Sequence, residues 1–181
     1  MGDVTELWPQ GGGAKISAPV PIESGHIVEN FECGKAVLND WLKNNARKAE
    51  ARSARTYVVC AGNVVIGYYC LSTGGVLRDD APAKLRRNMP TSVPIITLGR
   101  LAVDGAHQSR GIGSGMLADA IRRTLGVARE AGVRAMLLHA IDDEAISYYL
   151  QYGFLQFPEG DKTLFLPVET MVEAIGCLAR R

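Results

Sequence analysis

A glycine-rich segment that follows an apolar run is the part of this chain whose residues point most directly to chemistry. The run Leu101-Ala102-Val103 is typical of the end of a strand, and an amphipathic helix is expected to begin near Gly113. Backbone N–H groups at a helix start lack partners and lie at the positive end of the helix dipole, so they attract phosphate. Gly111 and Gly113 allow a ligand close to the main chain, and Arg110 adds positive charge. The segment predicts a phosphate-bearing ligand; a glycine-rich turn without a ligand is the alternative.

Two other glycine-rich phosphate sites fit this segment less well. A P-loop ends in Gly-Lys-Ser/Thr, whereas Gly113 is followed by Ser114-Gly115 with no lysine. A dinucleotide-binding loop has a third glycine and, about twenty positions later, an acidic residue at the end of the next strand. Here Met116 stands at the third glycine, and Glu130 falls within the helical pattern. What remains is Gln-x-x-Gly-x-Gly after a strand.

Hydrophobic periodicity predicts the elements that must position this segment. A helix is expected from Cys33-Gly34 through Arg55, with one apolar face made of Val37, Leu38, Trp41, Leu42 and Ala46. Further helices are expected over 113–131 and 144–152, and strands over 15–20, 56–61, 64–72, 95–103, 135–140 and 163–168. A hairpin turn at Gly62-Asn63 and a basic loop over 77–94 with one short helix complete the expected elements. Their order predicts a mixed α/β (α+β) fold rather than a doubly wound parallel sheet.

Length and composition limit the class of protein. At 181 residues, 47% of them hydrophobic, the chain is expected to form one domain over 15–181 after a loose lead-in over 1–14. The four cysteines form no Cys-x-x-Cys pair and the three histidines are scattered, so no metal site is expected. We see no secretory signal and no apolar run long enough for a membrane, and therefore expect a cytoplasmic protein. A net charge of +1 means that any nucleic-acid surface must be local.

The Gln-x-x-Gly-x-Gly pattern resembles the acetyl-CoA pyrophosphate loop of the GNAT family of N-acetyltransferases. The resemblance implies a GNAT-type domain whose mixed central sheet splays at the cofactor-binding strands, so that pantetheine lies between them. It also implies that a main-chain N–H near Val103 stabilises the developing oxyanion. The residues expected to contact acetyl-CoA are Leu101, Ala102, Val103, Gln108, Ser109, Arg110, Gly111, Ile112, Gly113, Ser114 and Tyr149.

Acetyl transfer from a thioester to an amine requires a neutral amine and a proton for the leaving thiolate. A thiol has a pKa of ~8.5 and a phenol of ~10, so a tyrosine can return that proton. The segment from Ala145 to Phe154 resembles the family motif Ala-x-x-aromatic-Tyr-x-x-x-Gly-Phe, which assigns Tyr149 as the general acid. Tyr148 and Tyr152 are expected to pack, and a buried structural role for Tyr149 is the alternative. His139, at a strand end, is expected to be structural rather than a base.

The similarity extends beyond the cofactor loop. Matching motifs are Phe31-x-Cys33-Gly34 with Leu38-Asn39-x-Trp41-Leu42, Thr56 to Val59, Ile66 to Tyr69, Pro94-Ile95, Leu98 to Asp104 and Ala145 to Phe154. Over roughly residues 16 to 168 the chain resembles the toxin acetyltransferases of type II toxin–antitoxin modules. That resemblance implies N-acetylation of the α-amino group of aminoacyl-tRNA, which stops translation. It also implies a ribbon-helix-helix antitoxin and a homodimer. Ser109-Arg110 departs from the Gly-Lys or Gly-Arg of many relatives but keeps the positive charge.

Local basic residues and the lack of an evident carboxylate base agree with such a substrate. Residues 43 to 55 hold five basic residues and one acidic residue, and the 78–87 loop adds four basic and two acidic. Such residues bind phosphates without reading sequence, although basic runs are often simply solvated faces. The candidate tRNA-binding residues are Lys43, Arg47, Lys48, Arg52, Arg55, Arg86 and Arg87. Helical spacing predicts that Lys48, Arg52 and Arg55 share one face of the expected helix. An α-amino group, with a pKa of ~7.7 to 8, is partly neutral at pH 7, whereas a lysine at ~10.4 is not.

Two further functions stay open at this point. One is the same fold acting on a small-molecule amine or a protein N-terminus. The other is a catalytically silent module that binds CoA or only a partner protein. Acceptor sites for polycations are expected to be rich in carboxylates, and Asp142-Asp143-Glu144 is the one such cluster in the sequence.

Overall fold

The computed structural model describes residues 15–50, 52–158 and 162–179, so the expected lead-in over 1–14 lies outside the described residues. The described chain groups into two compact units: unit 1 comprises 15–71 and 100–119, and unit 2 comprises 72–99 and 120–179. Its seven strands follow the order β1-β2-β3-β4-β5-β7-β6. Among the neighbouring strands whose relative direction is described, β4 and β5 are parallel and the other pairs are antiparallel. The mixed α/β class is therefore confirmed, while one domain over 15–181 stays a prediction.

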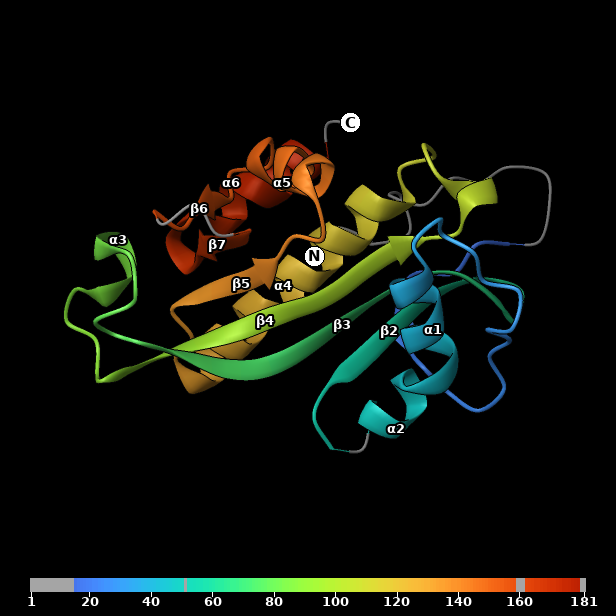
Figure 1. The fold of residues 1–181 in the computed structure, drawn as a ribbon, viewed down its shortest axis with the longest axis horizontal. Coiled ribbons are helices and arrows are strands. Elements are labelled where there is room, and N and C mark those ends of the chain that lie inside the picture. Colours follow the sequence, from blue (N-terminus) through green and yellow to red (C-terminus); the bar gives the residue numbers. More distant parts are fainter. Residues whose placement is uncertain (1–14, 51, 159–161, 180–181) are drawn as a thin grey trace. The chain divides into compact units, whose positions relative to one another are not determined.

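Unit 1 is built around an antiparallel hairpin. β2 (Arg55–Ala61) pairs with β3 (Val64–Leu77) from Arg55–Leu71 to Ala61–Val64, and β1 (Val20–Pro21) pairs with the other edge of β2. The predicted turn at Gly62-Asn63 is confirmed: Gly62 has φ +63°, a left-handed conformation that glycine adopts at no steric cost. β3 and β4 (Ser92–Val103) are the two longest strands (Figure 1).

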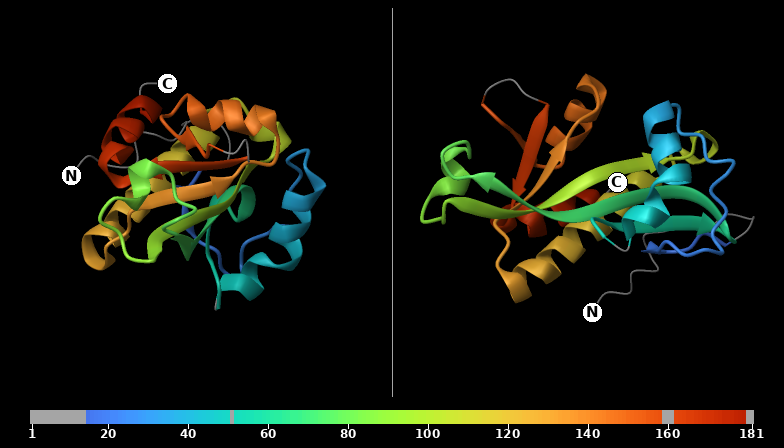
Figure 2. Two further views of the ribbon diagram at one scale, coloured as in Figure 1. Left: turned by 60° about the vertical axis from the view of Figure 1, so that its left-hand side comes forward. Right: turned by 60° about the horizontal axis from the view of Figure 1, so that its bottom comes forward.

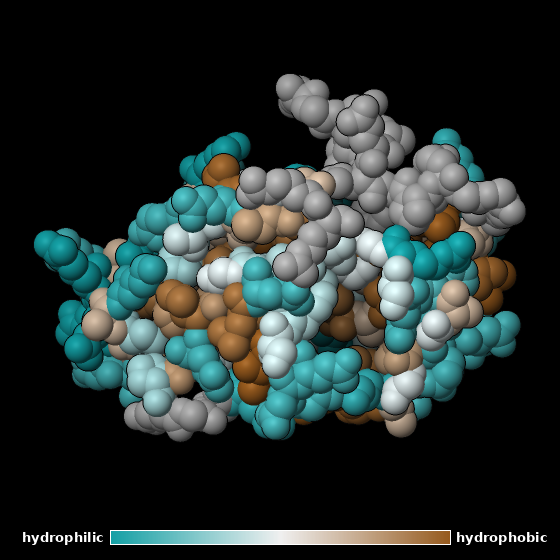
Figure 3. Space-filling model, turned by 90° about the horizontal axis from the view of Figure 1, so that it is seen from above, coloured by the Kyte–Doolittle hydropathy of each residue, from teal (hydrophilic) through white to brown (hydrophobic). Residues whose placement is uncertain are grey.

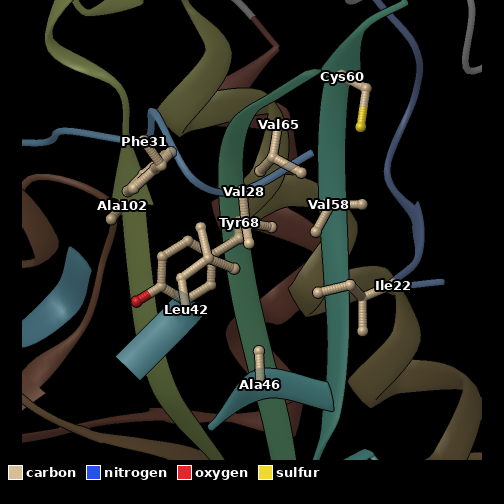
Figure 4. Packing of buried hydrophobic residues seen from close by; sticks show 10 residues of the cluster. All are labelled: Ile22, Val28, Phe31, Leu42, Ala46, Val58, Cys60, Val65, Tyr68 and Ala102. Atoms are coloured by element: carbon tan, nitrogen blue, oxygen red, sulfur yellow. The ribbon is translucent and has the colours of Figure 1, made fainter. Parts of the chain in front are cut away.

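Two short helices cover one face of this hairpin. α1 (Ala36–Asn44) and α2 (Ala46–Glu50) bury Leu42 and Ala46, both fully inaccessible, against Val58 of β2 and Tyr68 of β3 (Figure 4). The Trp41 ring stacks on Tyr68 with 5.9 Å between ring centroids. Burial of these apolar side chains is what holds the helices to the strands.

In unit 2 the strands surround β5. β5 (Ala135–His139) pairs in parallel with β4 from Ile95–Ala135 to Thr97–Leu137. On its other edge it pairs antiparallel with β7 (Thr163–Pro167), which in turn pairs with β6 (Leu155–Gln156) (Figure 2). The helices of this unit are α3 (Ala83–Arg86), α5 (Asp143–Leu150), α6 (Met171–Leu178) and the second part of α4 (Ile112–Ala131).

Four predictions about local structure are wrong. The expected strand over 15–20 is reduced to β1 and an isolated bridge at Ile16. The helix predicted through Arg55 breaks at Asn45 and ends at Glu50, because consecutive asparagines are poor helix formers and the β-branched residues after Arg55 favour a strand. Arg55 therefore begins β2 and shares no helical face with Lys48. Val37, expected in the core, is 58% exposed.

Among the described helices, none is both long and apolar enough to cross a bilayer. On the face drawn in Figure 3, hydrophilic side chains predominate and hydrophobic ones form separate patches.

Candidate active site

The start of α4 has the geometry of an anion site. The chain passes through a short 3-10 turn at Gly105–His107, and α4 then begins at Ile112. Ser109 and Gly111 have positive φ angles of 59° and 79°, which turn the chain sharply before the helix. The first N–H groups of a helix have no partner within it, and the exposed Arg110 lies beside them. These groups fit a pyrophosphate.

The predicted cofactor residues fall into two groups: some can contact a ligand only through their main chain, and others stabilise the loop. The side chains of Ala102 and Ile112 are buried, at 6% and 1% exposed, so only their main chain is free to face a ligand. Gln108 donates from Nε2 to the carbonyl oxygens of Val103 (3.0 Å) and Cys33 (3.2 Å). Gln108 therefore holds the loop in place. Ser114 donates to the carbonyl of Gly111 (2.9 Å), which closes the first turn of α4.

In unit 2, α5 positions the predicted general acid. The Asp142 side chain caps α5 by accepting from the Ala145 N–H (2.9 Å). Tyr149, 8% exposed, packs with ring centroids 5.2 Å from Tyr148 and 5.3 Å from Phe154. Burial raises the pKa of the Tyr149 phenol well above its usual range. Among the described residues nothing hydrogen-bonds its hydroxyl, so that group keeps its proton and can donate it to a substrate.

A cavity of about 720 Å³ lies in unit 2, at the last pair of the parallel ladder, Thr97 and Leu137. Its apolar wall includes Ile95 and Phe157. Its polar lining includes Asp79, Asp80, Arg86 and His139. Sequence reasoning missed this cavity because its walls come from segments far apart in the chain, which no local pattern joins.

His139 and the basic residues differ in how they are engaged. The His139 Nδ1 lies 2.8 Å from the Thr163 hydroxyl across the β5/β7 pair, which supports its expected structural role. Arg47 donates to the carbonyls of Glu23 and His26, and Arg55 contacts Glu50, so both are engaged within the chain. Lys48 and Arg52 are exposed and form no ion pair with the part of the chain that the structure describes. Arg86 lines the cavity, and Arg87 is exposed.

Comparison with known proteins identifies the family. The sequence model described as the acetyltransferase (GNAT) family matches residues 24–154. This chain belongs to the GNAT family. It is therefore an acetyl-CoA-dependent N-acetyltransferase, and no group of three or more His, Cys, Asp or Glu among its described residues is arranged to hold a metal.

Individual relatives and structures agree with the family. The tRNA-acetylating toxin of Mycobacterium tuberculosis is 40% identical over 161 residues, which are 88% of this chain and 97% of that protein. The crystal structure of a Tyr-to-Phe mutant of KacT has a TM-score of 0.80 and 27% identity, covering 87% of this chain and 98% of that one. AtaTR bound with acetyl-CoA has a TM-score of 0.77 and 25% identity, covering 87% and 96%.

Within this GNAT fold, cofactor binding and proton donation are expected from different residues. Acetyl-CoA supplies an activated acetyl thioester. The start of α4 and Arg110 are suited to bind its pyrophosphate, and the buried Tyr149 hydroxyl is suited to hold the proton that the departing thiolate takes.

Tyr149→Phe removes only the hydroxyl, and we expect kcat to fall about 100-fold or more because the thiolate then leaves without a proton donor. The dissociation constant of acetyl-CoA should stay within about twofold, since the ring still packs. Release of the CoA thiol measures kcat, and calorimetry measures binding. Tyr152→Phe, in the turn after α5, is the matched control and should keep most activity. Equal activity in Tyr149→Phe and Tyr152→Phe would remove Tyr149 from the role of general acid.

Proposed function

We propose that this acetyltransferase is a toxin that transfers acetyl from acetyl-CoA to the α-amino group of aminoacyl-tRNA and so blocks translation. The observation that carries the proposal is the 40% identity with a tRNA-acetylating toxin over 97% of that toxin's length. Similarity over 88% of this chain extends well beyond the cofactor loop that GNAT enzymes share, so it includes the regions proposed to bind the acceptor.

The chemistry of the site supports an α-amine acceptor. Tyr149, with its raised pKa, is suited to donate a proton and not to remove one. An acceptor that is already partly neutral at pH 7 needs no strong base, and an aminoacyl α-amine is of that kind. We assign the cofactor contacts to the end of β4, residues 101–103, and to the segment 108–114.

Charge supports a nucleic-acid acceptor. Lys48 and Arg52 bring positive charge without a carboxylate partner in the described chain, whereas Lys43 acts electrostatically on Glu32. All three are proposed to contact the tRNA backbone. Arg47 and Arg55 add positive charge near these residues, although Arg47 also donates to the Glu23 carbonyl and Arg55 pairs with Glu50. Arg86 and Arg87 are proposed to guide the acceptor end toward the cavity of unit 2, where Arg86 is part of the lining.

The protein is proposed to work in the cytoplasm, where charged tRNA is found, and to form a homodimer. Its second partner is an antitoxin, and we propose the ribbon-helix-helix type that the sequence resemblance implies. A polyamine, an antibiotic or a protein N-terminus as acceptor is the competing proposal within the same fold.

Incubation of the protein with acetyl-CoA and a mixture of charged tRNAs should yield N-acetylated amino acids. Mass analysis of the amino acids released from tRNA by mild base detects an added acetyl group on each. Tyr149→Phe serves as the control for non-enzymatic acetylation. Recovery of only unmodified amino acids across all charged tRNAs would contradict the proposed substrate.

Removing the positive charges of Lys48 and Arg52 should weaken tRNA binding and make that binding less dependent on salt. For the double variant Lys48→Ala/Arg52→Ala we expect the slope of log K against log salt to become shallower by roughly 1 to 2. Acetyl-CoA affinity should not change. Lys15→Ala/Arg129→Ala removes the same charge from exposed positions outside the proposed surface and is the matched control. An identical slope in the two double variants would exclude this surface.

The pH dependence should show one ascending limb. kcat/KM is expected to rise through pH ~8 as the α-amine loses its proton, and then to stay level to about pH 10. The level part follows because burial raises the pKa of Tyr149, so its protonated form persists to higher pH than that of a free phenol. Initial rates at short times, before ester hydrolysis, measure this. A descending limb with a midpoint near 9 would mean that a less buried group is the acid.

A further inference from the structure

The loop Glu32–Gly34, just before α1, is tied to the segment that leads into the phosphate loop. The N–H of Glu32 donates to Oδ2 of Asp104 (3.0 Å), and the Glu32 carbonyl accepts from the Gly105 N–H (2.8 Å). The Cys33 carbonyl accepts from Nε2 of Gln108 (3.2 Å). Three hydrogen bonds thus join two stretches that are about seventy residues apart in the chain. None of the residues assigned to catalysis or to acetyl-CoA binding lies in this loop.

Asn39 holds the same loop from the other side. Its Oδ1 accepts from the Cys33 N–H (2.9 Å), and its Nδ2 donates to Oε1 of Glu32 (2.6 Å). That Glu32 oxygen also accepts from the Gly34 N–H (2.8 Å), and these two bonds lower the pKa of Glu32. The side chain of Asn39 is only 4% exposed, yet its amide oxygen and its amide nitrogen each form a hydrogen bond. A buried amide that is bonded through both atoms favours one conformation of the loop.

Asp104 connects the Glu32–Gly34 loop to the turn before α4, because its two carboxylate oxygens accept hydrogen bonds from both segments. While Oδ2 accepts from Glu32, Oδ1 accepts from the Ala106 N–H (3.1 Å) and lies 3.3 Å from Nδ1 of His107. Burial acts to raise the pKa of Asp104, but the hydrogen bond from Glu32 and the His107 contact outweigh it, so the carboxylate stays ionised. Its own N–H donates to the Ile66 carbonyl of β3 (2.9 Å).

Gly105 leaves little room for the two stretches to separate or shift. A Cβ at this glycine would lie 3.3 Å from the Glu32 carbonyl oxygen. Only three residues separate Asp104 from Gln108, and Gln108 begins the segment 108–114. A displacement at Asp104 therefore passes directly to the N–H groups at the start of α4.

We propose that Asp104, Glu32 and Asn39 form a clamp that positions the 108–114 segment for the pyrophosphate of acetyl-CoA. These are positioning residues, and the clamp rests on the proposed cofactor role of that segment. A preorganised loop loses less conformational freedom on binding, so a broken clamp lowers affinity without removing a ligand contact.

Asp104→Asn tests the clamp with almost no change in size. Its amide must present an NH₂ group to either the Glu32 or the Ala106 N–H, so one bond is lost and two donors face each other. We expect the dissociation constant of acetyl-CoA to rise about tenfold, and that of S-acetylpantetheine, which lacks the pyrophosphate, to change less than about twofold. Calorimetry measures both. Asp40→Asn, an equal charge change at an exposed position of α1, should leave both unchanged.

Gln108→Ala provides a second variant if Asp104→Asn folds poorly, because it removes the bonds to Cys33 and Val103 from an exposed position. Like Asp104→Asn, it should weaken the binding of acetyl-CoA more than that of S-acetylpantetheine.

Unchanged affinity for acetyl-CoA, or an equal loss of affinity for both ligands with a lower melting temperature, would overturn the clamp and leave a structural role only. Arg110→Ala separates the two proposals: if it too leaves acetyl-CoA affinity unchanged, the cofactor role of 108–114 fails together with the clamp. Binding to acetyl-CoA needs no acceptor, so none of these results depends on tRNA as the substrate.

Discussion

To bind a pyrophosphate as proposed, the first turn of α4 must expose its unpaired N–H groups and still keep one fixed shape, and its neighbours in unit 1 supply that shape. An exposed helix start gains nothing from burial there, so its shape has to come from its neighbours. The positive φ angles at Ser109 and Gly111 set the turn, while Ile112 anchors it in the core with 1% exposure. Beyond it, Met116 packs within 3.1 Å of the position that a Cβ at Gly67 would occupy. A side chain at Gly67 would therefore crowd the side chains of Met116 and Ile112, which would have to shift by a few tenths of an ångström.

Tyr149, the proposed general acid, has the opposite surroundings, because it is buried. Tyr149 is surrounded by the Tyr148 and Phe154 rings, and burial rather than a nearby charge raises its pKa. A phenol with a raised pKa is a weak acid for most purposes. In the proposed role, a thiolate that leaves in the same low dielectric would also be destabilised, so its demand for the proton would increase.

Local signals allowed the turn before α4, α4 itself and α5 to be predicted from the sequence, whereas the features that depend on distant residues could not be predicted. Glycines 111 and 113, the apolar period of α4 and the Ala145 to Phe154 motif each lie within one short stretch. The break at Asn45 overrode an amphipathic pattern that ran on to Arg55, and Val37 is exposed although its spacing fits the buried face. Neither the cavity nor the contact of Glu32 with Asp104 could be predicted, because their members meet only after folding.

No Glu or Asp stands out in the sequence as a general base, and this bears on the proposed acceptor. An enzyme that does not remove the proton from its acceptor must take amines that are neutral at the pH of the cell, and an aminoacyl ester amine meets that condition better than a lysine. Selection among such amines must then come from binding. The contacts proposed for Lys48 and Arg52 with phosphates would not distinguish one tRNA from another. Discrimination between charged tRNAs therefore has to come from a shaped site, and among the described residues of unit 2 the cavity between Thr97 and Phe157 has the size for it.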